Sequence, residues 1–172
     1  MNEQKQSSSD YKNKSSFYGL IYGIFSALLL YLSFKFEFQN TLVMSFVSLV
    51  VAVTIVFYPI HAYKIENANL LKLGEALKIG LRVGLVGGLI YAVYTYMHYK
   101  SIDTEFISQA LQESQKAIEE NTQGLSEEEL KQASEVTSIM VSPFIIATVN
   151  LFTLLFKSFI IALVVGLIKK NQ

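Results

Sequence analysis

The sequence predicts an all-α fold: an integral membrane four-helix bundle with an acidic extracytoplasmic helical hairpin between spans three and four. Hydrophobic residues make up 52% of the 172 residues, and they are clustered in long runs. Four of these runs reach the roughly 17–25 residues that a helix needs to cross a bilayer. The one long polar segment separates the third run from the fourth. We therefore place the spans at residues 17–34, 41–63, 76–99 and 144–168, and the outer helical segment at residues 100–138.

The composition narrows the classes of function. The sequence has no cysteine, which excludes disulfides, thiolate metal sites and thiol catalysis. The 14 basic and 14 acidic residues give a net charge of zero, and no basic tract suits a nucleic acid. We expect a single membrane domain, residues 16–172, after a flexible polar cytoplasmic tail, residues 1–15. We expect no cofactor and no nucleic-acid partner.

The first two apolar runs each read as a complete span. The run over residues 17–34 is too long for the core of a secretory signal and has no small-residue cleavage site, so we expect an uncleaved helix. In the second run, Ser45 and Ser48 begin a mildly polar line, and Pro59 is expected to kink or loosen the last turn. The short loop that follows makes the second and third spans antiparallel neighbours.

The outer segment, residues 100–138, carries nine acidic residues against three lysines, a net charge of −6. It reads as two short helices. Asp103 or Thr104 is available to cap the first helix, and Ser126 with Glu129 forms a capping box for the second. We expect the second helix to run on towards the last span, with a kink at Pro143.

Lysine and arginine placement predicts the orientation. With both termini cytoplasmic, the inner side holds the lysines of the tail, of the loop between spans two and three, and of the C-terminus. The outer side holds far fewer basic residues, as the positive-inside rule requires. Lys78 and Arg82 then lie near the inner boundary, where they serve as lipid-headgroup anchors by snorkelling towards phosphates.

Small residues recur every fourth position in the first and third spans. In a helix this spacing builds a smooth stripe along which another helix backbone can approach closely. The two stripes pair naturally with each other inside the chain, and a dimer interface is the alternative. The predicted helix-packing residues are Gly19, Gly23, Ala27, Ala76, Gly80, Gly84, Gly88 and Ala92.

Lys157 is the most informative single residue. It precedes Lys169 by 12 positions, or roughly 18 Å along a helix, which places it near the middle of a hydrocarbon core roughly 30 Å thick. A lysine there requires a polar partner, and Asn150 lies two turns away. Two interpretations stand: an intramembrane polar site for an ion, proton or lipid headgroup, or a tilted helix with a local water defect.

The sequence offers no catalytic or metal-binding constellation. It contains no nucleophile elbow, no metalloprotease motif and no phosphate-cradling glycine loop. Consecutive glutamates such as Glu127 and Glu128 fan out from a helix and do not converge on a cation. We therefore expect a protein that is not an enzyme and has no catalytic, cofactor-binding or metal-binding residues.

The chain resembles a bacterial membrane-protein family known as domain of unknown function 4199. The resemblance rests on LGEALKIGLRVGLVGGLIYAVYTYMHYKSID, residues 73–103, on GLIYGIFSALLL, residues 19–30, and on the acidic segment before the last span. It implies a multi-span protein of the bacterial cytoplasmic (inner) membrane and supplies no catalytic residues.

Two functions follow as hypotheses. The first is a non-enzymatic membrane protein that acts through helix packing or association, with the lipid bilayer, a second copy or another membrane protein as its partner. The alternative is a small transporter or channel-like subunit that uses Lys157 as an intramembrane polar site. Few polar residues accompany Lys157 in the spans, which favours the first hypothesis.

Overall fold

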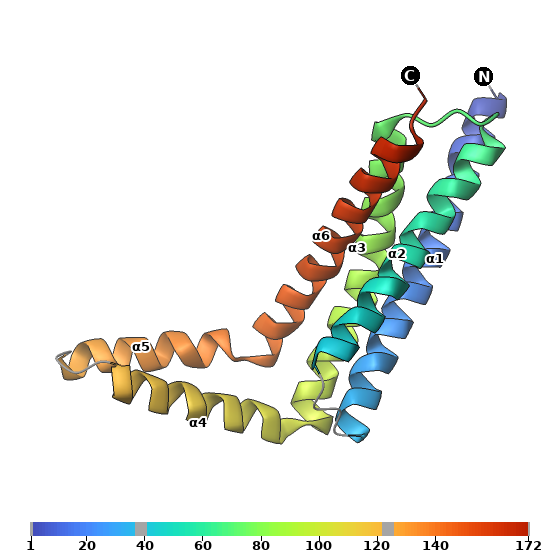
Figure 1. Cartoon of the computed structure of the whole chain (residues 1–172). Helices are drawn as coiled ribbons and strands as arrows, with labels where there is room; N and C mark the ends of the chain where they lie inside the picture. The colour runs from blue at the N-terminus through green and yellow to red at the C-terminus, as the bar shows by residue number, and fades with distance from the viewer. Residues whose placement is uncertain (1, 37–40, 122–125, 172) are drawn as a thin grey trace. The chain divides into compact units, whose positions relative to one another are not determined.

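The structure, a computed structural model, describes residues 2–36, 41–121 and 126–171, and within these ranges every regular element is a helix. The elements are α1 (Asn2–Lys35), α2 (Thr41–Glu66), α3 (Leu73–Met97), the π-helical turn η1 (His98–Ile102), α4 (Thr104–Asn121), α5 (Glu127–Met140) and α6 (Pro143–Lys169). Figure 1 shows their order along the chain. The predicted all-helical fold is confirmed.

Four of the helical segments are long and apolar enough to cross a membrane, judged by length and composition. They are Tyr11–Lys35, Leu42–Glu66, Leu73–Ile102 and Pro143–Lys169. Each overlaps one of the four spans predicted from the sequence. The largest shift at a predicted boundary is at the start of the first segment.

The chain divides into two compact units. The first contains residues 1–91 and 150–172, and the second contains residues 92–149. In the first unit α1, α2, the greater part of α3 and most of α6 lie side by side (Figure 1). We call this four-helix unit the bundle. Its core consists of apolar side chains from all four helices, among them Tyr22, Val56, Ile60, Ile79, Val83, Leu154 and Ile161.

Helix α1 begins at Asn2, so its helical backbone extends into the segment expected from the sequence to be a polar tail, residues 1–15. The reason lies in contacts with α2 that hydropathy does not register. The ring of Tyr11 meets that of Tyr63 edge to face at 5.5 Å. Ser15 is only 1% exposed, and its hydroxyl donates to the Tyr11 carbonyl at 2.6 Å. These polar residues therefore belong to the packed helix.

In the second unit, the predicted caps are present. The backbone N–H of Phe106 donates to Asp103 Oδ1 at 3.2 Å, so Asp103 caps α4. Ser126 and Glu129 form the reciprocal capping box at the start of α5. The expectation of one helix kinked at Pro143 is wrong: α5 ends at Met140 and α6 begins at Pro143. Proline suits the first turn of a helix, where its missing N–H leaves no bond unmade.

Candidate functional site: the Lys157 pocket

A pocket of about 260 Å³ lies in the bundle and is lined by all four of its helices. Its apolar lining comes from Leu29, Leu30, Met44 and Leu154. Its polar lining is Ser26 and Ser33 of α1, Ser45 and Ser48 of α2, Tyr91 of α3, and Asn150, Thr153 and Lys157 of α6. We call this the Lys157 pocket. It brings together the two residues that the sequence singled out as a polar site, Lys157 and Asn150.

Helical periodicity explains why these side chains converge. Residues three, four and seven positions apart lie on one face of a helix. Asn150, Thr153 and Lys157 therefore form one polar line on α6, spanning roughly 10 Å along the axis. Ser26 and Ser33 are also seven positions apart on α1. Helices α1, α2 and α6 each contribute two or more polar side chains and α3 contributes Tyr91, and packing brings them to the same pocket.

Lys157 is the only charged residue among those that line the pocket. It lies near the midpoint of α6, which runs from Pro143 to Lys169, and its side chain is half-buried. Side chains on a helix tilt towards its N-terminus, so the lysine stem leans towards Thr153 and Asn150. Between residues whose side chains the structure describes, the ion pair is Lys14 with Glu66, so none of these carboxylates pairs with Lys157.

Several polar groups in the pocket lack a partner within the described part of the chain. The Lys157 ammonium, the Asn150 amide and the hydroxyls of Ser33, Ser45 and Ser48 make no side-chain hydrogen bond to another described residue. Leaving such groups unsatisfied in an apolar surrounding costs roughly 1–3 kcal/mol for a neutral group and more for a charge. The pocket is therefore a place where hydrogen-bonding groups are available to something other than the protein.

The side chains that line the Lys157 pocket can donate hydrogen bonds to a bound molecule. An ammonium offers three donors and no acceptor, and hydroxyl and amide groups donate and accept. The Ser26 hydroxyl is already committed as a donor to the Tyr22 carbonyl at 2.8 Å, so it faces the pocket as an acceptor. No carboxylate or imidazole is among the lining residues. Within the described ranges no three His, Asp or Glu residues cluster as a metal site would require.

The glycine stripe of α3 packs against α6. A methyl group placed on Gly80 would lie 2.9 Å from the Ser158 carbonyl oxygen, and one on Gly84 would lie 2.9 Å from the Leu155 Cα. A methyl group on Gly88 would likewise lie 3.0 Å from the Leu151 carbonyl oxygen. These distances leave room for hydrogen only, so the backbones of α3 and α6 are in direct contact.

The sequence paired the glycines of α1 with the small-residue stripe of α3, and the structure does pack these glycines on α3, but against another face than the one that carries Gly80 and Gly84. A methyl on Gly19 would lie 2.9 Å from the Val83 oxygen, and one on Gly23 would lie 2.7 Å from the Gly87 oxygen. Thus α1 packs on a second face of α3, away from Gly80 and Gly84. Of the other predicted packing residues, Ala76 is buried, Ala27 is half-buried on α1, and Ala92 belongs to the second unit.

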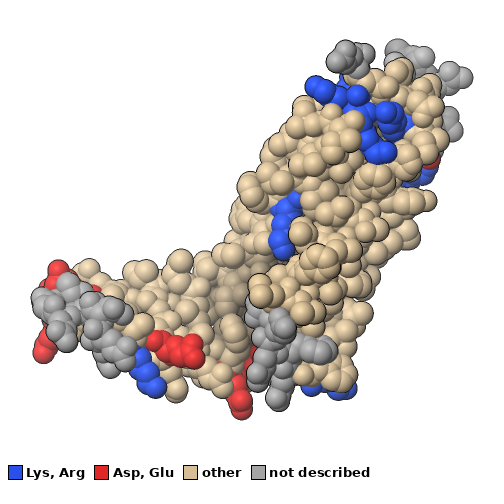
Figure 2. Space-filling view, in the orientation of Figure 1, with Lys and Arg blue, Asp and Glu red and all other residues tan. Residues whose placement is uncertain are grey.

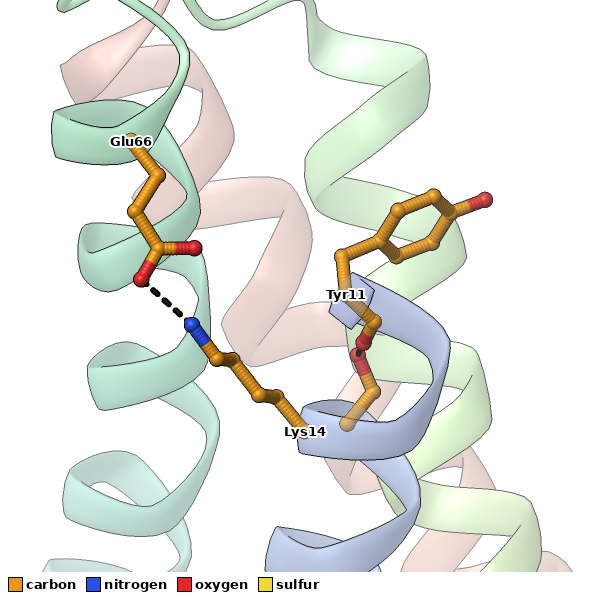
Figure 3. A network of polar contacts seen from close by, with 4 residues as sticks. Tyr11, Lys14 and Glu66 are labelled. Carbon is orange, nitrogen blue, oxygen red and sulfur yellow. Dashed lines mark hydrogen bonds and ion pairs between the residues drawn. The ribbon is translucent and has the colours of Figure 1, made fainter. Parts of the chain in front are cut away.

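The end of the bundle that holds both chain termini is basic, and Figure 2 shows Lys and Arg gathered there. Lys14 of α1 pairs with Glu66 of α2 across the surface (Figure 3). Lys64 Nζ donates to the Lys169 carbonyl at 2.8 Å, which ties the ends of α2 and α6 together. The C-terminal ends of α2 and α6 therefore lie side by side at this end of the bundle.

The predicted headgroup anchors both lie on the half of α3 nearer this basic end. Lys78 is exposed and borders a cavity of about 150 Å³ with Tyr11, Tyr63 and Glu75. Arg82 lies one turn further along α3 and is half-buried. Neither residue takes part in the Lys157 pocket.

Sequence reasoning missed Ser26, Ser33 and Tyr91 as members of the pocket. The signal was present in part, because Ser26 and Ser33 keep the seven-residue spacing of one helix face. Periodicity shows which residues share a face, but it does not show which neighbouring helix that face meets. The polar residues within each single span therefore underestimate how many polar side chains lie near Lys157.

Comparison with known proteins places the chain in a family. The family described as "Protein of unknown function (DUF4199)" matches residues 17–171, and the chain belongs to it. The match includes three of the four long apolar segments entirely and the first from residue 17 onward. No curated protein and no solved structure matches the chain.

Proposed function

We propose that this member of the DUF4199 family is a four-span integral membrane protein that binds a small polar solute in the Lys157 pocket and catalyses no reaction. The observation that carries the proposal is the pocket itself. Its half-buried lysine lies with the Asn150 amide and the hydroxyls of Ser33, Ser45 and Ser48, which make no side-chain hydrogen bond to another described residue. A binding site inside a bundle is where helical membrane proteins place solutes.

The surface of the bundle supports the membrane assignment. Large apolar side chains cover its outside: Leu42 is 82% exposed, Phe46 67% and Phe156 65%. Soluble proteins seldom leave contiguous patches of this kind in water, whereas lipid solvates them. A helix of 27 residues such as α6 is roughly 40 Å long, enough to cross a hydrocarbon core roughly 30 Å thick.

The charge distribution supports an orientation with both termini in the cytoplasm of a bacterial cell, the membrane being the inner one. The end of the bundle that carries Lys14, Lys64, Lys72 and Lys169 then faces inward, as the positive-inside rule requires. Helices α4 and α5 then form the acidic hairpin outside.

Solute binding is favoured over association through the small-residue stripes, because these stripes are used within the chain. Gly80 and Gly84 are in contact with α6, and Gly19 and Gly23 with α3. A second copy or another membrane protein would find no free glycine surface at these positions. Serines and a lysine line the pocket, but among the described residues no serine hydroxyl is hydrogen-bonded to the Lys157 ammonium as an activated nucleophile would be, which supports a role without covalent chemistry.

The proposal is tested by asking whether a water-borne reagent reaches the pocket in a membrane. The chain has no cysteine, so single cysteines report without interference. We expect Ser48→Cys, inside the pocket, to react with a small charged methanethiosulfonate reagent in proteoliposomes. Leu49→Cys is the matched control, because Leu49 is the next residue and is 49% exposed on the lipid-facing surface. Equal reaction at both positions, or none at Ser48→Cys, would refute a solvated binding pocket.

A further inference from the structure

We infer that the Lys157 pocket selects a compact oxyanion of single negative charge, such as a carboxylate or a phosphodiester. This inference rests on the proposed function and names the class of solute. It follows from three features of the described residues: the charge around the pocket, its hydrogen-bonding groups and its size.

Among the described residues of the bundle, no carboxylate lies near the charge of Lys157. Helix α6 contains no Asp or Glu, and neither does α1 from Tyr11 to Lys35. In α2 the sole acidic residue is Glu66, 18 positions or roughly 27 Å along the helix from Ser48. In α3 the sole acidic residue is Glu75, which lies roughly 24 Å along the helix from Tyr91. Lys157 is the one charged residue among those that line the pocket, so an anion of single negative charge from outside the described chain would balance it.

The hydrogen-bonding groups suit oxygen atoms of an anion. The Lys157 ammonium of α6 supplies donors at the middle of the bundle. Ser48 and then Ser45 of α2 line the pocket in the direction of the end opposite the chain termini. Asn150 and Ser33 continue the same polar path on α6 and α1. A carboxylate or phosphodiester accepts several such bonds at once. A cation would meet the ammonium directly and is disfavoured.

The volume limits the size of the anion. The pocket of about 260 Å³ holds the equivalent of roughly nine water molecules at about 30 Å³ each. This is below the roughly 300–1,000 Å³ of pockets that enclose drug-sized ligands. A small free carboxylate fits, and so does the headgroup of a lipid whose chains remain outside. Both sources present the same chemistry to Lys157.

The first experiment measures charge selection with the full-length protein in phosphatidylcholine vesicles. Ser48→Cys is treated with anionic sulfonatoethyl methanethiosulfonate and with its cationic trimethylammonium counterpart, and each rate is divided by the rate with a free thiol. We expect the anionic reagent to be favoured, and Lys157→Met to lower the anion-to-cation ratio by roughly tenfold or more. Lys157→Arg keeps the charge and is expected to keep the preference, which separates loss of charge from loss of fold.

The outcomes separate this inference from the proposed function. If neither reagent reacts with Ser48→Cys, the solvated pocket is absent and the proposed function fails. If both react at equal normalised rates, or if Lys157→Met leaves the ratio unchanged, the pocket is solvated and the anion selection is overturned. The ratio is measured again with Glu37→Gln, because Glu37 lies outside the described residues. A preference that appears only in that variant also overturns the inference.

The second experiment distinguishes the two sources of the anion. Sodium butyrate added to the buffer, or phosphatidylglycerol included in the vesicle, is tested for protection of Ser48→Cys against the anionic reagent. Protection by butyrate supports a free carboxylate, and protection by phosphatidylglycerol supports a lipid headgroup. Protection that is equally strong in Lys157→Met, or a complete lack of protection by both anions, contradicts selection of a compact oxyanion.

Discussion

Replacing Gly84 by isoleucine is expected to destabilise the contact between α3 and α6. A methyl group on Gly84 would lie 2.8 Å from Ser158 Cβ and 2.9 Å from Leu155 Cα, whereas carbon atoms in ordinary contact are roughly 3.5–4.0 Å apart. The helices must therefore separate by roughly 0.6–1.1 Å for the first carbon alone. Overpacking of this kind typically costs 1–3 kcal/mol, and isoleucine has three further carbons to place. The better helix propensity of isoleucine offsets less than about 1 kcal/mol, so we expect a net loss of about 2 kcal/mol.

The matched control is Gly74→Ile on the same helix. No atom lies within 4 Å of a methyl group placed on Gly74, so the same chemical change meets open space. The assay is unfolding of the purified protein in mixed micelles with increasing mole fraction of dodecyl sulfate, followed by tyrosine fluorescence. The chain has 10 tyrosines and no tryptophan. A midpoint for Gly84→Ile equal to that of Gly74→Ile would refute the argument that direct backbone contact holds α3 to α6.

Two further predictions concern the second unit. Hydrogen bonds from the backbone N–H and the hydroxyl of Ser126 hold the pKa of Glu129 below its ordinary value of 4.5. Because the pKa is lowered by folding, the cap stabilises α5 above about pH 4.5 and is lost as the pH falls through the lowered pKa. An NMR titration of the Glu129 carboxyl group should give a midpoint below 4.5, moving up in Ser126→Ala, and an ordinary midpoint in the intact chain would contradict it. Separately, Ser114→Cys in α4 should react with a membrane-impermeant reagent added to intact cells, and reaction only after lysis would reverse the proposed orientation.

The sequence was sufficient wherever the determining interactions are local. The four long apolar helices follow from runs of apolar residues, because length and hydropathy are properties of one segment. The capping box of α5 joins Ser126 to Glu129 within one turn, so three-residue spacing predicts it and the structure confirms it. The cap of α4 by Asp103 was predicted in the same way, as one of two alternatives.

The sequence was insufficient to determine which faces of two helices pack against each other. Gly19 and Gly23 form a stripe on α1, and Ser158 lies on a similar stripe of α6, so spacing alone does not decide which one meets Gly84. The structure places Ser158 against Gly84, and α1 on another face of α3. The choice depends on the side chains that surround each stripe and on the loops that order the helices, which are properties of the whole bundle.

The packing of α3 against α6 also explains how a single lysine acquires a polar pocket. Ser158 is in contact with Gly84, and Lys157 is its neighbour in sequence, about 100° away around the helix. Direct contact between the two backbones leaves α6 little freedom to turn about its axis. That fixed rotation directs Lys157, Thr153 and Asn150 together towards the hydroxyls of α1 and α2. Helix α6 therefore packs against the small-residue stripe of α3 with one face and lines the cationic pocket with another. The close packing of the first face determines the position of the second.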